Sequence, residues 1–244
     1  MAGMERKICW LSAGVSSFIA GWLVRETVTD WIYIDIEDQH PDSLRFIKDC
    51  EKALGVEVQI LRSDKYRNVE EVCRKFRFVN SPGGAPCTGQ LKKQVRARYE
   101  RENLSDDLTY IWGFDRNEGR RAEHICENFP EFKHEFPLID RGLTKQDAHG
   151  ILAMLGIEKP VMYRMGYSNN NCIGCVKGGM WYWNKIRKDF PEVFAKRAKM
   201  ERDIGMSCIN GVFLDELDPN AGRKSEELDN ECSLICLYEM GAFN

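Results

Sequence analysis

Short apolar segments alternate with amphipathic stretches along the first two thirds of the chain. The apolar segments are rich in β-branched and aromatic residues, and they predict strands at residues 7–11, 31–36, 56–61 and 108–114. Helical spacing of apolar positions predicts helices at residues 18–26 and 42–54. This alternation is typical of a three-layer α/β fold, in which helices cover both faces of a parallel sheet.

Past the middle of the chain the pattern becomes less regular. Residues 80–89 contain Ser-Pro-Gly-Gly-Ala-Pro and predict a loop, and a basic helix is expected over residues 90–102. Thr144, with Asp147 three residues later, predicts a capping box that opens a helix ending near residue 155. A loop is expected at residues 163–179, helices at 181–204 with a break at Pro191, and an irregular acidic tail after them. We therefore predict an α/β domain over residues 1–160 and an appendage of loop, helices and tail over residues 161–244.

Composition and charge narrow the class of protein. The chain has 244 residues, 43% of them hydrophobic, which is enough to build a substantial core. Its net charge of −3 argues against indiscriminate binding to phosphate backbones. The first apolar run is interrupted by serines and glycine, which argues against a signal or membrane segment, so we expect a cytoplasmic protein with no membrane partner. In that setting most of the ten cysteines are expected to be reduced thiols, metal ligands or core residues.

A loop of small residues follows the first predicted strand and precedes the first predicted helix. Its backbone amides and hydroxyls would converge at the positive end of that helix, where an anion such as phosphate or sulfate is favoured. A serine-capped turn without a ligand would use the same residue types, but the position at the carboxyl edge of a parallel sheet favours binding. The candidate binding residues are Ser12, Ala13, Gly14, Ser16 and Ser17.

This loop resembles the Ser-Gly-Gly-x-Asp-Ser loop of the PP-loop and phosphoadenylyl-sulfate (PAPS) reductase superfamily. Ala13 stands in place of a glycine and Ser16 in place of the aspartate, which is closer to the reductase branch. The resemblance extends in order from about residue 7 to residue 205, including an expected strand at residues 136–139. It implies an adenine nucleotide alpha-hydrolase-like fold and an adenine nucleotide, either adenylyl sulfate or ATP, as ligand.

Two further segments carry the resemblance to nucleotide-binding residues. Asp35 ends the second predicted strand, where it could hold a ribose hydroxyl or a metal. Gly113 begins a segment that resembles the family's Gly-x-Arg-x-x-Glu motif, with Asp115 where the family usually has arginine. Arg116 and Arg121 in this segment could pair with the anionic tail of the nucleotide, or they could belong to a solvated helix start.

The cysteines suggest a second chemical site. Cys172 and Cys175 are separated by two residues in a loop rich in Gly and Asn, a spacing that suits a shared metal or cluster, a redox dithiol, or two unrelated thiols. With Cys87 they resemble the Cys-Cys…Cys-x-x-Cys set that binds a 4Fe-4S cluster in some reductases, although Pro86 replaces the first cysteine. The missing ligand could come from Cys208, Cys232 or Cys236, and zinc or free thiols are the alternatives.

A cysteine near the C-terminus resembles the nucleophile of the sulfonucleotide reductases. Cys232 follows a glutamate, as in the family's Glu-Cys-Gly tail, and would attack the sulfur of a bound adenylyl sulfate, with Lys92 assisting. A thioredoxin-like protein or a neighbouring thiol would then act as reductant. The sequence leaves the oligomeric state open, with a homodimer as one candidate. Two other functions stay open: a PP-loop enzyme that adenylates or thiolates another substrate, such as a nucleic acid, and a nucleotide-binding protein that has lost catalysis.

Overall fold

The computed structural model describes residues 5–81, 84–103 and 108–227. These residues form two compact units built from segments that alternate along the chain. The first unit holds the described residues of 5–35, 41–61 and 99–170, and the second holds those of 36–40, 62–98 and 171–227. This division differs from a single boundary at residue 160, because residues 36–40 and 62–98 group with the segment that begins at residue 171.

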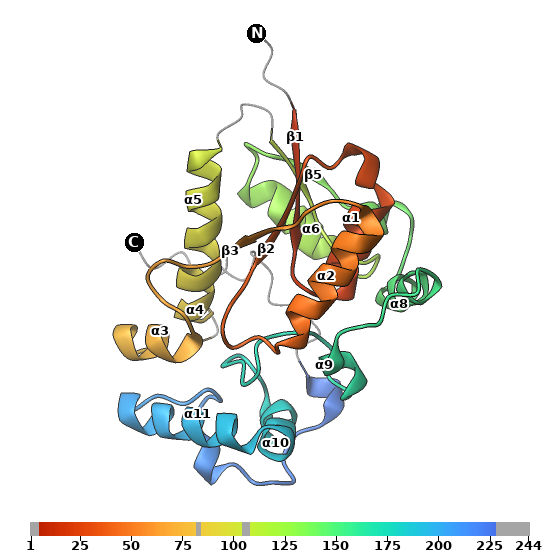
Figure 1. Ribbon diagram of the computed structural model, residues 1–244. Helices are drawn as coiled ribbons and strands as arrows, with labels where there is room; N and C mark the ends of the chain where they lie inside the picture. The colour runs from red at the N-terminus through yellow and green to blue at the C-terminus, as the bar shows by residue number, and fades with distance from the viewer. Residues whose placement is uncertain (1–4, 82–83, 104–107, 228–244) are drawn as a thin grey trace. The chain divides into compact units, whose positions relative to one another are not determined.

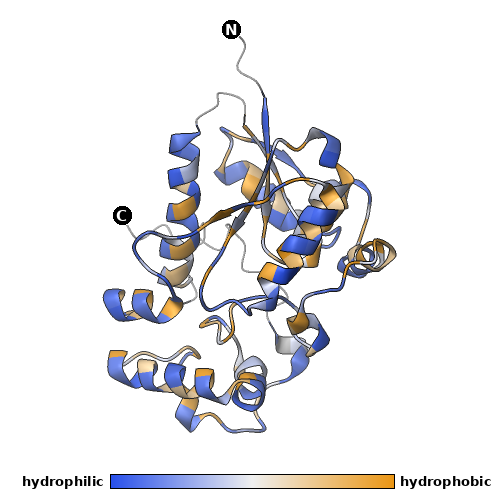
Figure 2. Cartoon of the chain, viewed as in Figure 1, coloured by the Kyte–Doolittle hydropathy of each residue, from blue (hydrophilic) through white to orange (hydrophobic). Residues whose placement is uncertain are grey.

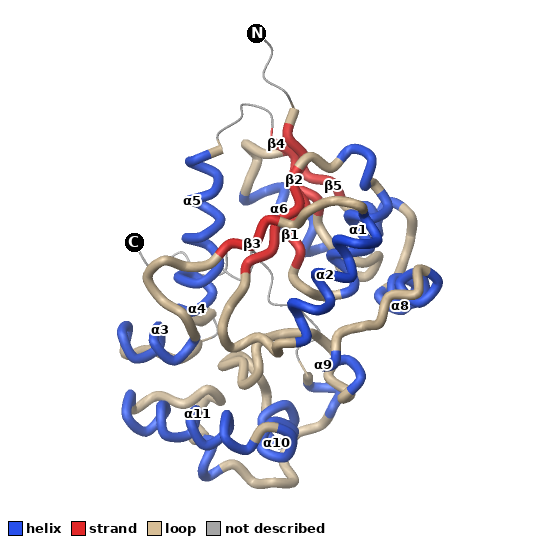
Figure 3. The backbone as a smooth tube through the Cα atoms, in the orientation of Figure 1, coloured by secondary structure: helices blue, strands red, loops and turns tan. Residues whose placement is uncertain are grey.

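A five-stranded, all-parallel sheet forms the centre of the first unit (Figure 3). Its order is β3-β2-β1-β4-β5. From β1 the chain moves outward to β3, and it then returns to place β4 on the other side of β1. The order of the strands therefore reverses between β1 and β4, which is where open α/β sheets bind their ligands. The strands are β1 (Arg6–Leu11), β2 (Asp30–Ile34), β3 (Gln59–Leu61), β4 (Leu108–Ile111) and β5 (Lys133–Glu135).

Helices cover both faces of this sheet, as the alternating pattern predicts. Cys9 and Leu11 share a buried cluster with Phe18 of α1 (Val15–Leu23) and Phe46 of α2 (Asp42–Leu54). Trp10 points to the opposite face and packs edge-on against Tyr99 at a ring distance of 5.7 Å. Figure 1 shows α1 and α2 on one side of the sheet and α6 (Gly119–Asn128) on the other. Apolar residues mark the strands and the inner sides of these helices in Figure 2.

The remaining helices of the first unit are short or lie at its edge. They are η1 (Arg25–Thr27), α7 (Pro137–Asp140), α8 (Lys145–Met154) and α9 (Val161–Arg164). The predicted capping box is confirmed, since the Thr144 hydroxyl accepts the N–H of Asp147 and the Asp147 carboxylate accepts that of Thr144. The strand expected at residues 136–139 is wrong. Pro137 opens α7 there, because its fixed φ suits the first turn of a helix, and β5 ends just before it.

The second unit is helical and has a small core of its own. Trp183 and Met200 are fully buried, and the buried Glu201 carboxylate accepts the N–H groups of Cys208 and Leu214. The break predicted at Pro191 is confirmed, since α10 ends and α11 begins there. The predicted loop at 80–89 ends earlier than expected, because the chain becomes helical at Pro86. The elements are α3 (Val69–Phe76), α4 (Pro86–Thr88), the π-helix η2 (Gly89–Lys93), α10 (Met180–Asp189), α11 (Pro191–Ile204), η3 (Leu214–Glu216) and η4 (Lys224–Glu226), while α5 (Gln94–Glu102) runs from this unit into the first.

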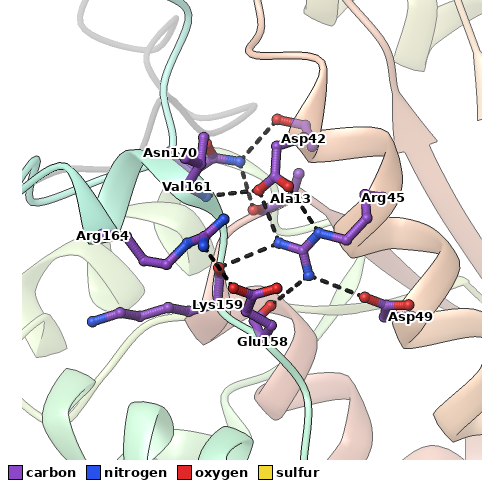
Figure 4. A network of polar contacts seen from close by, with 10 residues as sticks. Ala13, Asp42, Arg45, Asp49, Glu158, Lys159, Val161, Arg164 and Asn170 are labelled. Atoms are coloured by element: carbon purple, nitrogen blue, oxygen red, sulfur yellow. Dashed lines mark hydrogen bonds and ion pairs between the residues drawn. The ribbon is translucent and has the colours of Figure 1, made fainter.

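An ion-pair network ties the start of α2 to the segment before α9 (Figure 4). The Arg45 guanidinium pairs with Asp42 at 2.8 Å and with Asp49 at 3.0 Å, and it also donates to the carbonyl oxygens of Glu158 and Lys159. The Asp42 oxygen of the 2.8 Å pair, Oδ2, also accepts the N–H of Val161 at 2.7 Å. Hydrogen bonds from Arg45 hold the pKa of Asp42 below its usual value, although burial opposes this shift. The network therefore stabilises the first unit mainly when Asp42 is ionised.

Replacing Asp42 with asparagine tests this network. We expect Asp42→Asn to lower the free energy of unfolding by about 1 kcal/mol at pH 7, because Arg45 loses its charged partner. The contribution of Asp42 is complete above about pH 4, the unfolded pKa, and is lost as the pH falls through the lower folded pKa. Urea unfolding at pH 7 and pH 3 should thus show a difference between parent and variant that shrinks in acid. The exposed Asp140→Asn is the control, and an equal loss in both variants would contradict the role of the network.

Candidate functional site

The carboxyl ends of three neighbouring strands bring predicted binding residues to one edge of the sheet. Ser12 follows β1, Asp35 follows β2, and Gly113 lies two residues after β4. The pairs Leu11 with Tyr33 and Cys9 with Ile111 fix the register of these strands. Three segments that are far apart in the sequence therefore meet at the point where the strand order reverses.

The loop between β1 and α1 is held together by its own serine hydroxyls. The Ser17 hydroxyl accepts the N–H of Ser12 at 3.0 Å, donates to the carbonyl of Gly14 at 3.0 Å, and contacts the Ser12 hydroxyl at 2.9 Å. The Ser12 hydroxyl in turn accepts the N–H of Gly14 at 3.1 Å. These bonds use two of the predicted serine hydroxyls to shape the loop, whereas the sequence suggested them as donors to a ligand.

Ala13 adopts a left-handed backbone conformation in this loop. Its φ is +56°, which is unfavourable for a residue with a Cβ and explains why a glycine suits this position in the family that the loop resembles. The side-chain amide of Asn170 donates to the Ala13 carbonyl at 2.9 Å and to the Ser43 hydroxyl at 3.0 Å (Figure 4). Asn170 is buried, so its amide fixes the turn from a second segment of the same unit.

The first turn of α1 offers main-chain donors next to this loop. Gly14 is the N-cap and provides no side-chain acceptor to the helix. The N–H groups of Val15, Ser16 and Ser17 therefore have no acceptor within the helix, and they lie at the positive end of its dipole. The Ser16 hydroxyl forms no hydrogen bond with other residues in the described part of the chain. These groups are the donors that could bind an anion.

Gly113 lies against the backbone of that turn. A Cβ at this position would be 2.6 Å from both the Cα and the nitrogen of Ser17 and 2.8 Å from the carbonyl carbon of Ser16. Backbone atoms cannot move aside as the end of a flexible side chain can, so a glycine is required here. The sequence identified Gly113 from a motif, and the structure gives the packing reason for it.

The acidic and basic residues after Gly113 are largely engaged with one another. The Asp115 carboxylate accepts the N–H groups of Asn117 and Lys145, at 2.7 and 3.1 Å, which explains an aspartate at the place where the family has arginine. Arg121 pairs with Glu118 and lies 4.5 Å above the Phe114 ring. The candidate Arg121 is thus committed to local contacts.

Arg116 and Lys145 are two further cations of this unit. Arg116 is exposed, while its N–H donates to the Leu143 carbonyl at 2.9 Å and holds its backbone. The Lys145 ammonium donates to the side chain of Asn169 at 2.7 Å, and the adjacent Asn170 binds the loop. Sequence reasoning missed Lys145, since only the path of the chain brings it near the residue that contacts Ala13.

A pocket in the second unit collects the three predicted cysteine ligands. Cys87, Cys172 and Cys175 line it together with the candidate Lys92, and the space including its open mouth is about 350 Å³. The Thr88 hydroxyl in the lining is buried and has no hydrogen-bond partner among the described residues. The remaining lining residues are Ile36, Val69, Leu91, Val176 and Lys177. The structure therefore brings the predicted thiols together in a largely apolar pocket.

Cys208, the fourth candidate ligand, is not part of this lining. Its buried thiol has a raised pKa, first because of burial and then because of the neighbouring Glu201. Within residues 5–81, 84–103 and 108–227, no group of three or more His, Cys, Asp and Glu side chains is arranged to hold a metal ion. Cys232 and Cys236 lie outside the described residues. The donor set suits a soft metal, but the described side chains do not form a closed metal site.

The other described cysteines are free thiols with different surroundings. Burial raises the pKa of Cys9 and Cys50, and it raises that of Cys73 to about 12. A thiol with such a pKa is almost entirely protonated at neutral pH and is a poor nucleophile. Cys126 is exposed on α6. The buried thiols therefore act as core residues.

Comparisons with known proteins do not assign the chain. No protein-family model and no curated protein matches its sequence. What the structure shows is the class of fold: a parallel α/β domain with strand order 3-2-1-4-5, as in Rossmann-like and nucleotide alpha-hydrolase folds, with a helical C-terminal region. No helix in the described part of the chain combines the length and apolar composition needed to cross a membrane.

Adding a methyl group at Gly113 tests the close approach of β4 to the loop. We expect Gly113→Ala to lower the free energy of unfolding by about 2 kcal/mol, because the backbone of Ser16 and Ser17 must shift to make room. Gly119→Ala is a matched control, since a Cβ at Gly119 would meet nothing within 4 Å. Denaturant unfolding of the three proteins measures both effects. Equal stability of parent and Gly113→Ala would show that the turn is not packed in this way.

Proposed function

We propose that the loop at Ser12–Ser17 binds the phosphate or sulfate groups of an adenine nucleotide. The supporting observation is the position of this loop: it joins β1 to the N-terminus of α1 at the point where the strand order reverses. Gly113 keeps the neighbouring backbone close to the same turn without covering it with a side chain. An anion bound there would accept hydrogen bonds from main-chain N–H groups at the positive end of α1. Such binding does not require a buried cationic side chain.

The adenine part of the proposal comes from the resemblance to the PAPS reductase family. Asp35 follows β2 and would bind a ribose hydroxyl, as acidic residues after this strand do in dinucleotide-binding α/β folds. Arg116, which is exposed, would supply a guanidinium that can pair with phosphate or sulfate oxygens. Arg121 supports the segment through Glu118 and Phe114 and acts on the ligand indirectly.

We further propose that the chain is an oxidoreductase or sulfur transferase of the sulfonucleotide-reductase type. In this reaction the Cys232 thiolate attacks the sulfur of adenylyl sulfate, an S–S bond forms, and the S–O bond to the nucleotide breaks, so that the nucleotide leaves with the electron pair. A second thiolate then attacks the sulfur of Cys232, releasing sulfite and forming a disulfide. A thioredoxin-like dithiol is the external reductant that this balance requires.

The thiol pocket has a supporting role in this proposal. Cys87, Cys172 and Cys175 are the residues that would hold a 4Fe-4S cluster or zinc, and Lys92 adds positive charge at the same lining. Since the described side chains do not form a closed metal site, no reaction step is assigned to a metal. Free thiols throughout the described residues fit a reducing, cytoplasmic setting. Metal and sulfide analysis of anaerobically purified protein distinguishes cluster, zinc and free thiols.

Removing the Ser16 hydroxyl tests the binding site. Ser16→Ala should weaken binding of adenosine 5′-phosphosulfate by about tenfold, the effect of losing one hydrogen bond to a charged group. Calorimetric titration measures the affinity. Ser63→Ala, in the second unit, is the control and should bind as the parent does. Unchanged affinity in Ser16→Ala, with a fold as stable as the parent's, would remove this hydroxyl from the site.

Sulfite release tests the reaction. The parent protein, with a dithiol reductant, should release sulfite from adenosine 5′-phosphosulfate or from its 3′-phosphorylated form, and Cys232→Ser should release none. Cys126→Ser is the matched control, because Cys126 is exposed and has no role in the proposed reaction. Pyrophosphate release from ATP in the presence of RNA or DNA would instead support the adenylating enzyme. Tight nucleotide binding without turnover would support a binding protein.

A further inference from the structure

The turn at Cys172–Cys175 is fixed by contacts to main-chain groups of all four of its residues. The N–H of Ile173 donates to the Asp38 carbonyl at 2.7 Å, and the carbonyl of Gly174 accepts from Arg197 Nε at 3.2 Å. All of these residues belong to the second unit. The outer two residues, Cys172 and Cys175, are joined through the phenol hydroxyl of Tyr182, which donates to the Cys172 carbonyl at 2.9 Å and accepts the Cys175 N–H at 3.0 Å.

An ion pair between Arg197 and Asp38 supports this turn. Arg197 is 3% exposed, and its guanidinium pairs with the Asp38 carboxylate. The other Asp38 oxygen accepts the N–H of Val69, the first residue of α3, at 2.6 Å. Val69 also lines the thiol pocket. The inner side of the turn is thus anchored to α3 and α11, and its movement would break a buried ion pair.

Neighbouring side chains also pack closely against this turn. Gly174 has φ of +70°, and a Cβ there would lie 2.6 Å from Val193 Cγ1. The Tyr182 ring rests against Gly178, where a Cβ would be 2.0 Å from the ring. The Tyr182 ring also packs edge-on against Trp183, its neighbour in α10, with ring centroids 5.7 Å apart. The position of the phenol oxygen is therefore set by packing that does not depend on its hydroxyl.

We propose that Tyr182 is a positioning residue for Cys172 and Cys175. Its hydroxyl closes the turn so that the two thiols act together, as one bidentate site for a soft, thiophilic centre. This inference rests on the proposed function only in taking these thiols as reactive groups. It adds one specific contact: a hydroxyl that bonds to the main chain of both cysteines, and both cysteines line the pocket.

The probe for a bidentate thiol site is phenylarsine oxide. Two thiols form two As–S bonds with it, and the oxygen leaves as water with both thiol protons, so no electrons are transferred. Trypsin cleaves after Arg164 and Lys177, which leaves Cys172 and Cys175 in one peptide, residues 165–177, with no other cysteine. Mass spectrometry can therefore assign the bridge to this pair, separately from Cys87.

Tyr182→Phe keeps the ring and removes the hydroxyl. We expect the affinity of this variant for phenylarsine oxide at residues 165–177 to fall by about tenfold, because losing a residue that orients metal ligands typically lowers affinity by this factor or more. Competition with ethanedithiol measures the affinity. The rate at which iodoacetamide alkylates the same cysteines singly should change little. Tyr99→Phe is the matched control, because it removes a tyrosine hydroxyl bonded to Arg6 and Asp30 in the first unit, and it should change neither quantity.

Several results would overturn the proposal. These are a parent protein that does not bridge Cys172 and Cys175, a Tyr182→Phe variant that bridges as well as the parent, and a variant in which bridging and single alkylation change equally. The last result would indicate a general structural role. Arg197→Lys, which keeps the charge beside Asp38 but loses the Nε–H to Gly174, provides a second variant should Tyr182→Phe not fold, and the same loss of bridging is expected. Since no nucleotide is present, failure of the proposed sulfite release would leave this result unaffected.

Discussion

The first unit depends on how the chain turns from β1 into α1. The turn must be tight enough for α1 to pack on the sheet, yet it must leave the first N–H groups of the helix without a side-chain cap. Hydrogen bonds between Ser12 and Ser17 satisfy the first need, and Gly14 as N-cap satisfies the second. The left-handed conformation of Ala13 is the cost of this arrangement, and the buried Asn170 amide offsets it. A preformed, uncapped helix end is the feature on which the proposed anion binding rests.

The pocket lined by Cys87, Cys172 and Cys175 in the second unit differs from the loop between β1 and α1 in the groups that it presents. In the loop between β1 and α1, main-chain N–H groups at the start of the helix have no acceptor within the helix. In the turn at Cys172–Cys175, the main-chain groups described above are already bonded to Asp38, Arg197 and Tyr182. The chemistry there is left to the sulfur atoms. A rigid turn lowers the entropy that two thiols lose when they bind one centre, which favours bidentate binding over two independent reactions. The first unit thus offers main-chain donors, and the second offers side-chain sulfurs.

Periodicity predicted the fold better than it predicted the site. The bounds of α2, the capping box at Thr144 and the break at Pro191 follow from local signals, and the structure confirms them. The apolar segment at residues 136–139 suits a strand or a helix, and the proline at its second position favours the helix that the structure shows. The roles of Asn170, Lys145 and Tyr182 could not be predicted, since each depends on contacts made across the fold. Spacing pairs Cys172 with Cys175, and the family resemblance adds Cys87. The pocket that all three residues line gives them a common environment.

In the proposed site, the main-chain N–H groups at the start of α1 bind the anionic part of an adenine nucleotide. Titration of ¹⁵N-labelled protein with adenosine 5′-phosphosulfate, followed by amide resonances, tests this binding directly. We expect saturable shifts that are largest for the amides of Gly14–Ser17 and of Gly113, with smaller shifts in the rest of the sheet. Shifts confined to other residues, or none at saturating ligand, would contradict it.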